Sequence, residues 1–140
     1  MFIDQRTKHI LIVEDDEIFL AALIRGLSSL GHNVVGASDG QEALDLSANT
    51  RFDLVITDAV MPNMDGITLS HKLAELYPDL PIILMTGYNT QRERGKALDK
   101  IIQQVVDKPF DLNHICRITQ NVFDKIAAKR PINDNIEENK

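Results

Sequence analysis

One stretch decides the fold of this 140-residue chain: Leu54-Val55-Ile56-Thr57-Asp58, with the loop Ala59-Val60-Met61-Pro62-Asn63-Met64-Asp65-Gly66 behind it. Its first three residues form a continuous apolar run, which is typical of a strand covered on both faces and therefore of a parallel sheet. Asp58 stands where this strand is expected to end. Taken alone, an aspartate in that place is more often a turn or cap residue than a reactive group.

Similar apolar runs recur along the chain and alternate with stretches of helical spacing. The runs are 10–13, 33–37, 81–85 and the weaker pair Val105-Val106. The helical stripes are Leu20, Leu23, Leu27 and Leu30; Leu69, Leu73 and Leu76; Ala97, Leu98, Ile101 and Ile102; and Ile115, Ile118, Val122 and Ile126, with a shorter helix at 41–49. This alternation predicts a doubly wound, flavodoxin-like α/β fold: a five-stranded parallel sheet of order 2-1-3-4-5 flanked by five helices.

The ends of the helices carry their own signals. Asp16 and Asp111 stand where an aspartate accepts from the free amides of a first helical turn, and Gly31 suits a C-terminal cap. The helix expected to carry Ala97 to Ile102 starts with the nearly all-polar segment 89–96. We expect it to be the least well anchored of the five helices.

Composition limits the domain organisation and the classes of function. With 44% hydrophobic residues, the chain suffices for one domain, divided here into an N-terminal segment (1–8), a folded domain (9–128) and a disordered tail or truncated linker (129–140). A net charge of -6 argues against direct binding of nucleic acid. The single cysteine, Cys116, is interpreted as a buried small apolar residue. No apolar run approaches the roughly 20 residues that cross a bilayer, so no membrane contact and a cytoplasmic location are expected.

Polar residues stand at the carboxyl ends of four predicted strands. They are Glu14 and Asp15, Asp58, Thr86, and Lys108. Because parallel strands bring these ends to one edge of the sheet, the residues are expected to form one site. Crowded carboxylates repel each other and favour a hard divalent cation, and Mg²⁺ suits an incomplete oxygen cage. Each residue alone would suit a solvated turn or loop, but their joint occurrence favours a site.

This constellation resembles the receiver domain of two-component response regulators, of the chemotaxis-receiver kind. The resemblance covers roughly residues 8–128 and rests on the acids after Ile10-Leu11-Ile12-Val13, on Asp58 followed by Met61-Pro62-Asn63-Met64-Asp65-Gly66, on Thr86-Gly87 and on Lys108-Pro109-Phe110. It implies that Asp58 accepts a phosphoryl group from the phosphohistidine of a histidine kinase or phosphotransfer protein, assisted by Thr86 and Lys108. It further implies Mg²⁺ held by Asp15, Asp58 and the main-chain carbonyl of Val60, Glu14 acting through water, and a cis Lys108-Pro109 bond.

The chain departs from the family pattern at the switch. In receivers, movement of the threonine, here Thr86, is coupled to an aromatic residue on the last strand, where this chain has Val105. We therefore expect any switch to run through the loop after Thr86 and the helix near Gly95. Val60 and Tyr88 occupy positions that influence acyl phosphate hydrolysis in the family, and their bulk is expected to slow it.

Several alternatives stay open. The chain is a phosphorelay module acting on a downstream protein target or tethered output domain, a receiver fragment of a hybrid sensor kinase or longer response regulator, or a degenerate receiver used only for protein binding. We do not expect an enzyme beyond its own phosphorylation and dephosphorylation. An aspartyl-phosphate phosphatase commonly has an acid two residues after the nucleophile, where this chain has Val60. A flavin phosphate would be repelled by Glu14, Asp15 and Asp16.

Overall fold

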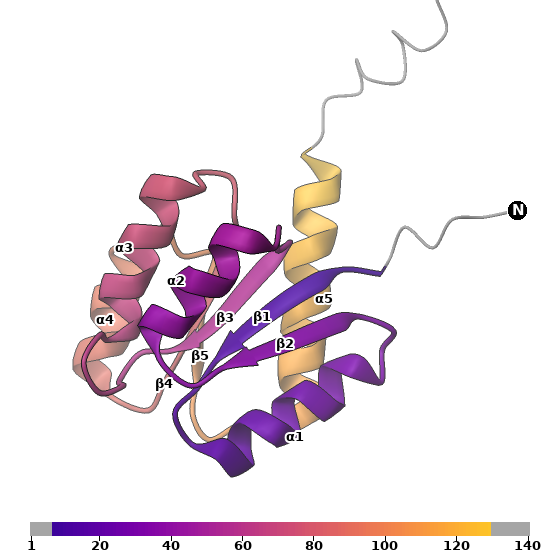
Figure 1. The fold of residues 1–140 in the computed structure, drawn as a ribbon, viewed down its shortest axis with the longest axis horizontal. Coiled ribbons are helices and arrows are strands. Elements are labelled where there is room, and N and C mark those ends of the chain that lie inside the picture. The colour runs from indigo at the N-terminus through magenta and orange to yellow at the C-terminus, as the bar shows by residue number, and fades with distance from the viewer. Residues whose placement is uncertain (1–6, 130–140) are drawn as a thin grey trace, which may run out of the picture.

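The computed structural model describes residues 7–129, which form a parallel sheet between two layers of helices (Figure 1). The strands are β1 (His9–Val13), β2 (Asn33–Ala37), β3 (Leu54–Asp58), β4 (Ile82–Thr86) and β5 (Gln104–Asp107). Their order is β2-β1-β3-β4-β5, with every pairing parallel, which confirms the predicted fold class. The predicted tail from residue 130 and residues 1–6 of the predicted N-terminal segment lie outside the described residues, so the domain limits stay a prediction.

The helices cover both faces of the sheet. They are α1 (Glu17–Ser28), α2 (Gly40–Asn49), α3 (Gly66–Leu76), α4 (Asn89–Lys96) and α5 (Leu112–Ala128). Figure 1 shows α1 and α5 on one side of the sheet and α2, α3 and α4 on the other. No helix within residues 7–129 combines the length and apolarity that a membrane crossing needs.

The hydrophobic core has two halves because side chains alternate across each strand. On β1, Ile10 and Ile12 pack with α1 and α5, whereas Leu11 and Val13 pack with α2 and α3. All five residues of β3 and all five of β4 are buried, as expected for central strands with continuous apolar runs. Burying each Leu or Ile contributes about 1.5–3 kcal/mol, so these two strands anchor the sheet edge where Asp58 and Thr86 stand.

The helix caps follow the sequence closely. Asp16 accepts from the amides of Ile18 and Phe19 at 3.0 and 3.2 Å, and Asp111 accepts from the amide of His114 at 2.7 Å. Both predicted N-caps are thus confirmed. Helix α1 is shorter than predicted at its C-terminal end. It ends at Ser28, and Leu30 lies outside it with 51% of its surface exposed. Gly31, with φ 94°, takes the left-handed conformation in the turn that follows.

The helix predicted to reach Ile102 is wrong in its extent. Helix α4 covers only the polar segment, ends at Lys96, and buries only Gly95. The apolar residues follow in turns, in which the amide of Leu98 donates to Gly95 and the amide of Ile101 donates to Leu98. Successive turns repeat every three residues and so carry nearly the same apolar spacing as a helix, which is why the pattern misled. The weak anchoring of α4 stays a prediction.

Candidate functional site

The residues predicted from strand ends lie at one edge of the sheet. Asp58 and Thr86 are the last residues of the adjacent strands β3 and β4, and Glu14 follows β1 directly. The main chain of Glu14 continues the pairing, because its amide donates to Ala37 at 3.0 Å. Lys108 follows β5, and its amide donates to the carbonyl of Thr86 at 2.9 Å. Neighbouring strands thus deliver two acids, a hydroxyl and a cation to the same edge.

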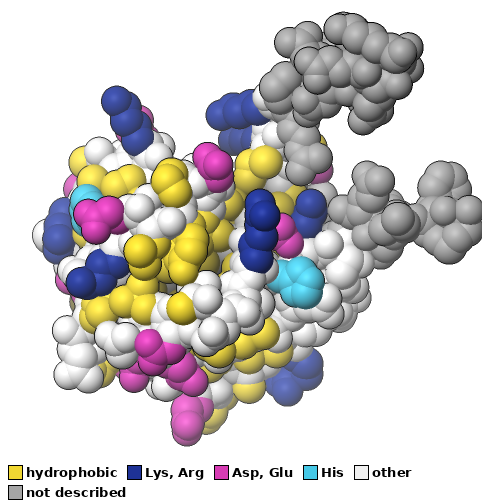
Figure 2. Space-filling model, turned by 45° about the horizontal axis from the view of Figure 1, so that its top comes forward, with side chains coloured by type: hydrophobic (Ala, Val, Ile, Leu, Met, Phe, Trp, Pro, Cys, Tyr) yellow, Lys and Arg dark blue, Asp and Glu magenta, His cyan; other side chains and the backbone are white. Residues whose placement is uncertain are grey.

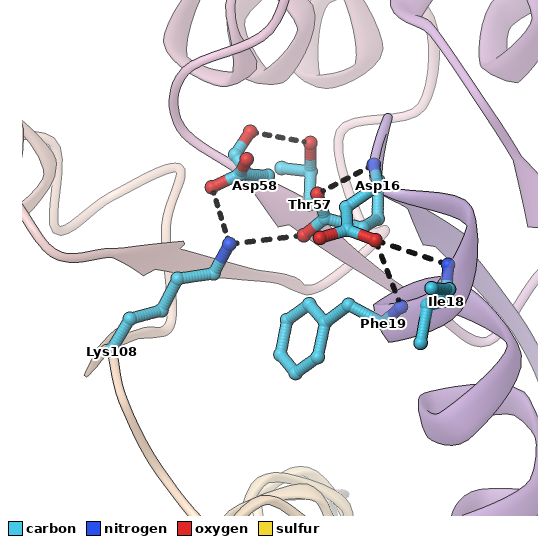
Figure 3. A network of polar contacts seen from close by, with 7 residues as sticks. Asp16, Ile18, Phe19, Thr57, Asp58 and Lys108 are labelled. Carbon is cyan, nitrogen blue, oxygen red and sulfur yellow. Dashed lines mark hydrogen bonds and ion pairs between the residues drawn. The ribbon is translucent and has the colours of Figure 1, made fainter.

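The side chain of Lys108 joins the two buried acids. Its Nζ lies 3.0 Å from Glu14 Oε1 and 3.2 Å from Asp58 Oδ1 (Figure 3). The Lys108-Pro109 peptide bond is cis, as the family resemblance implied. Figure 3 shows the lysine reaching from its loop toward Asp58. A cation therefore stands within ion-pair distance of the proposed nucleophile.

Three carboxylates at this edge fit a divalent cation. Glu14, Asp15 and Asp58 each offer an oxygen, and these atoms lie within 4.8 Å of one another. Glu14 and Asp58 are buried, at 2% and 8% exposure, whereas Asp15 is exposed to solvent. Hard oxygen donors at this spacing, with one side open to water, suit the partial cage that Mg²⁺ takes in proteins. The acidic cluster is thus compatible with a metal, and all three residues were predicted.

The electrostatics of the cluster also favour added positive charge. Burial raises the pKa of Asp58, although the charge of Lys108 opposes that rise. Burial likewise raises the pKa of Glu14, against the hydrogen bonds from Asp16 and Lys108. For Lys108, burial works to lower the pKa, but the hydrogen bond to Glu14 and the charge of Asp58 outweigh it and the pKa is raised. One ammonium therefore does not fully compensate the buried acids, and a second cation would relieve them.

Thr86 is buried, and its hydroxyl oxygen accepts a hydrogen bond from the amide of Tyr88 at 3.1 Å. Tyr88, two residues after Thr86, is 63% exposed, and Val60, two residues after Asp58, is 43% exposed. Val105 is half-buried on β5. It lies close to Gly95 of α4, where an added Cβ would be 3.0 Å from Val105 Cγ2. The predicted roles of Thr86, Val60 and Val105 stay predictions.

The sequence reasoning missed an aromatic neighbour of Lys108 and the ring that packs against it. The ring of Phe19 lies 4.8 Å from Lys108 Nζ, and the ring of Phe110 packs against Phe19. Phe110 belongs to the motif that carried the resemblance, but nothing in the spacing of Phe19 distinguishes it from a helix residue facing the core. Cys116, expected to be buried, is only partly so, although burial raises the pKa of its thiol.

A groove within the described part of the chain lies away from this site. It has a volume of about 800 Å³ and lies at the amino ends of the strands, between the end of α2, the loop after α3 and the end of α5. Figure 2 brings the top of Figure 1 forward and shows hydrophobic side chains gathered among scattered charged ones. None of the predicted site residues lines this groove. We therefore place the chemistry at the carboxyl edge of the sheet, where Glu14, Asp58 and Lys108 converge.

Comparisons with known proteins agree with this geometry. The family model described as the response regulator receiver domain matches residues 10–120. The response regulator MprA of Mycobacterium sp. (strain KMS) is 41% identical over 106 residues, which are 76% of this chain and 46% of that protein. The chain thus spans about half the length of the curated relatives it matches.

Solved structures with the same fold include two at moderate identity. The signal receiver domain of an HD domain-containing protein from Pseudomonas fluorescens Pf-5 is 30% identical with a TM-score of 0.80, covering 93% of this chain and 96% of that one. The response regulator protein TrrA from Thermotoga maritima, in complex with Mg(2+)-BeF, is 27% identical with a TM-score of 0.75, covering 82% and 98%.

Proposed function

This chain belongs to the response regulator receiver domain family, the phosphoacceptor module of two-component systems, and we propose that Asp58 is its acceptor. The phosphoryl donor is the phosphohistidine of a histidine kinase or phosphotransfer protein. One observation carries the proposal: Lys108 Nζ bonds Asp58 at 3.2 Å within a cluster of carboxylates that lies at the open edge of the sheet.

Phosphoryl transfer requires little covalent chemistry from the protein beyond the nucleophile itself. A carboxylate oxygen of Asp58 attacks the phosphorus in line, a P–O bond forms, the P–N bond to the donor histidine breaks, and its imidazole leaves with the electron pair. The ammonium of Lys108 balances negative charge on the transferring phosphoryl oxygens. The hydroxyl of Thr86 donates a hydrogen bond to one of these oxygens once the group has arrived.

The same edge would hold Mg²⁺ through Asp15, Asp58 and the main-chain carbonyl of Val60, with Glu14 acting through water. When bound, Mg²⁺ neutralises charge on the phosphoryl oxygens and on the crowded carboxylates. The burial of Asp58 and Glu14 and the raised pKa of each support this assignment, because both carboxylates gain from a nearby cation. The 27% identical TrrA structure is a complex with Mg(2+)-BeF, which also supports it.

We place the switch in the loop after Thr86 and in α4. The hydroxyl of Thr86 accepts from the Tyr88 amide, so turning toward a phosphoryl group on Asp58 changes a contact that holds this loop. Val105 has no aromatic ring, so it cannot make the ring movement that is typical of the family. Relaxation measurements with and without a phosphoryl mimic should show changes around residues 87–96, and their absence would contradict this route.

The direct test is intact mass after incubation with Mg²⁺ and a small phosphodonor such as phosphoramidate. We expect the mass of one added phosphoryl group in the parent and none in Asp58→Asn. Asp124→Asn serves as a matched control, because Asp124 is exposed on α5 and follows Phe123, which lines the groove at the opposite, amino end of the strands. An unchanged parent mass would instead favour a degenerate receiver that only binds protein. Turnover of small phosphate esters would make the chain an enzyme, and we expect none.

The partners and output follow from the same proposal. We propose a cytoplasmic module whose phosphorylation alters contacts with a downstream protein or with a tethered output domain. Because the curated relatives are about twice as long as the matched segment, a receiver part of a longer response regulator suits the comparison, and a hybrid kinase fragment is the alternative. Detection of the flanking coding sequence would separate these cases.

A further inference from the structure

The ammonium of Lys108 is held from two sides. On one side Nζ contacts the carboxylates of Glu14 and Asp58, and on the other it lies 4.8 Å from the centroid of the Phe19 ring. The ring of Phe110 packs against Phe19 with centroids 5.6 Å apart and planes tilted by 52°. Figure 3 shows the Phe19 ring, from the start of α1, beside the end of the lysine side chain. The Phe19 ring thus borders the cation that faces the acceptor, and Phe110 supports that ring from the side.

The main chain of Phe19 is linked to Glu14 through the N-cap residue of α1, Asp16. The amide of Phe19 donates to Asp16 Oδ1 at 3.2 Å, and the amide of Asp16 donates to Glu14 Oε2 at 3.1 Å. The other oxygen of Glu14 accepts from Lys108 at 3.0 Å. Glu14 is thus linked to Phe19 by two routes. One runs through the Asp16 cap, and the other runs through the Lys108 ammonium. The capped first turn of α1 therefore fixes the backbone of Phe19, and Phe110 borders its ring.

We propose that Phe19 is a positioning residue, whose ring holds the Lys108 ammonium beside Asp58 during phosphoryl transfer. The inference rests on the proposed acceptor role of Asp58. A lysine side chain is flexible, and its charge acts only where its stem is held. A ring face attracts a cation, and more strongly when the pair is partly shielded from water. When Asp58 becomes an acyl phosphate, its contact with the lysine changes, whereas the ring remains an unchanged partner.

The test compares Phe19→Leu, which keeps an apolar side chain but removes the ring, with Phe19→Tyr, which keeps the ring face. Phosphorylation by phosphoramidate with Mg²⁺ is followed by intact mass at saturating donor. We expect the rate of Phe19→Leu to fall about threefold to tenfold and that of Phe19→Tyr to stay within about twofold of the parent. Phe123→Leu is the matched control, since Phe123 is a buried ring on the same face of the sheet. Its rate should equal the parent rate even if its stability falls.

A second readout does not depend on phosphorylation. The proton shifts of the Lys108 side chain, measured by NMR, should carry a ring-current shift in the parent and in Phe19→Tyr that disappears in Phe19→Leu. A Phe19→Leu rate equal to the parent, or a Phe19→Tyr rate as low as that of Phe19→Leu, overturns the positioning role. If the parent takes up no phosphoryl group, the acceptor role of Asp58 fails instead, while a ring-current shift absent from the parent overturns the Phe19 contact by itself.

Discussion

Of the seven glycines, Gly66 leaves the least room for a side chain. An added Cβ would lie 2.0 Å from the carbonyl oxygen of Asp58, 2.9 Å from its carbonyl carbon and 3.0 Å from the Cα of Ala59. All three atoms belong to the main chain of the acceptor loop, and none can rotate away as a side chain can. The Gly66 amide also donates to the carbonyl of Ala59 at 2.8 Å, which fixes the approach. We therefore expect Gly66→Ala to displace the backbone that carries the acceptor.

The magnitude follows from two opposing effects. Overpacking a rigid core costs about 1–3 kcal/mol, and a backbone clash of this depth belongs at the upper end of that range. Replacing a helical glycine by alanine returns about 0.5–1 kcal/mol, because less backbone entropy is lost on folding. The net loss in the free energy of unfolding is thus about 2 kcal/mol. Total stabilities of about 5–15 kcal/mol make this a substantial fraction.

Urea unfolding followed by circular dichroism measures this loss. With a slope of about 1–3 kcal/mol per molar urea, the midpoint should fall by about 1 M. Gly26→Ala is the matched control, because Gly26 lies inside α1 and an added Cβ would meet only the Leu112 side chain at 3.4 Å or more. That variant should gain about 0.5–1 kcal/mol. A Gly66→Ala midpoint at or above the parent value, or equal losses in both variants, would refute the reasoning.

Three further outcomes are expected. Asp58→Asn should raise the free energy of unfolding near neutral pH without added metal, because burial raises the pKa of this carboxyl and its ionised form opposes folding. That gain should fade as urea titrations move below the ordinary pKa of 3.8, where Asp58 of the parent is protonated in both the folded and the unfolded state. Mg²⁺ at about 100 times its Kd should add about 2.7 kcal/mol to the stability of the parent alone. Asp16→Ala should lose about 1 kcal/mol in thermal unfolding through the missing cap of α1, and an unchanged midpoint would count against that cap. The acyl phosphate should decay more slowly in the parent than in Val60→Asn or Tyr88→Glu, as measured by loss of phosphorylated mass, and equal decay rates would sink the idea that their bulk obstructs water.

Predictions from the sequence succeeded where local pattern decides the structure. The strands came from continuous apolar runs, and both N-caps came from aspartates placed before helical stripes. The extent of the fourth helix failed, because turns after Lys96 repeat the apolar spacing of a helix. Leu30 failed for a related reason: apolar periodicity continued past Ser28, where the helix ends.

The site shows the same division. Glu14, Asp58, Thr86 and Lys108 could be gathered from sequence, because parallel strands deliver their carboxyl ends to one edge whatever the connecting helices do. The sequence did not predict that Lys108 would contact both Glu14 and Asp58, since Glu14 lies 94 positions away along the chain. The raised pKa values of Glu14 and Asp58 were equally out of reach, because they depend on how deeply each carboxyl is covered.

By itself, then, the sequence determined the order of strands, the caps of the helices and the set of reactive groups at one edge. The tertiary structure alone decided which of these groups touch, how far each is removed from water, and that the ring of Phe19 borders Lys108. The physical reason is range. Periodicity and capping act within a few residues, whereas ion pairs, desolvation and ring contacts depend on distances that exist only after α1, β3 and the loop after β5 have packed together.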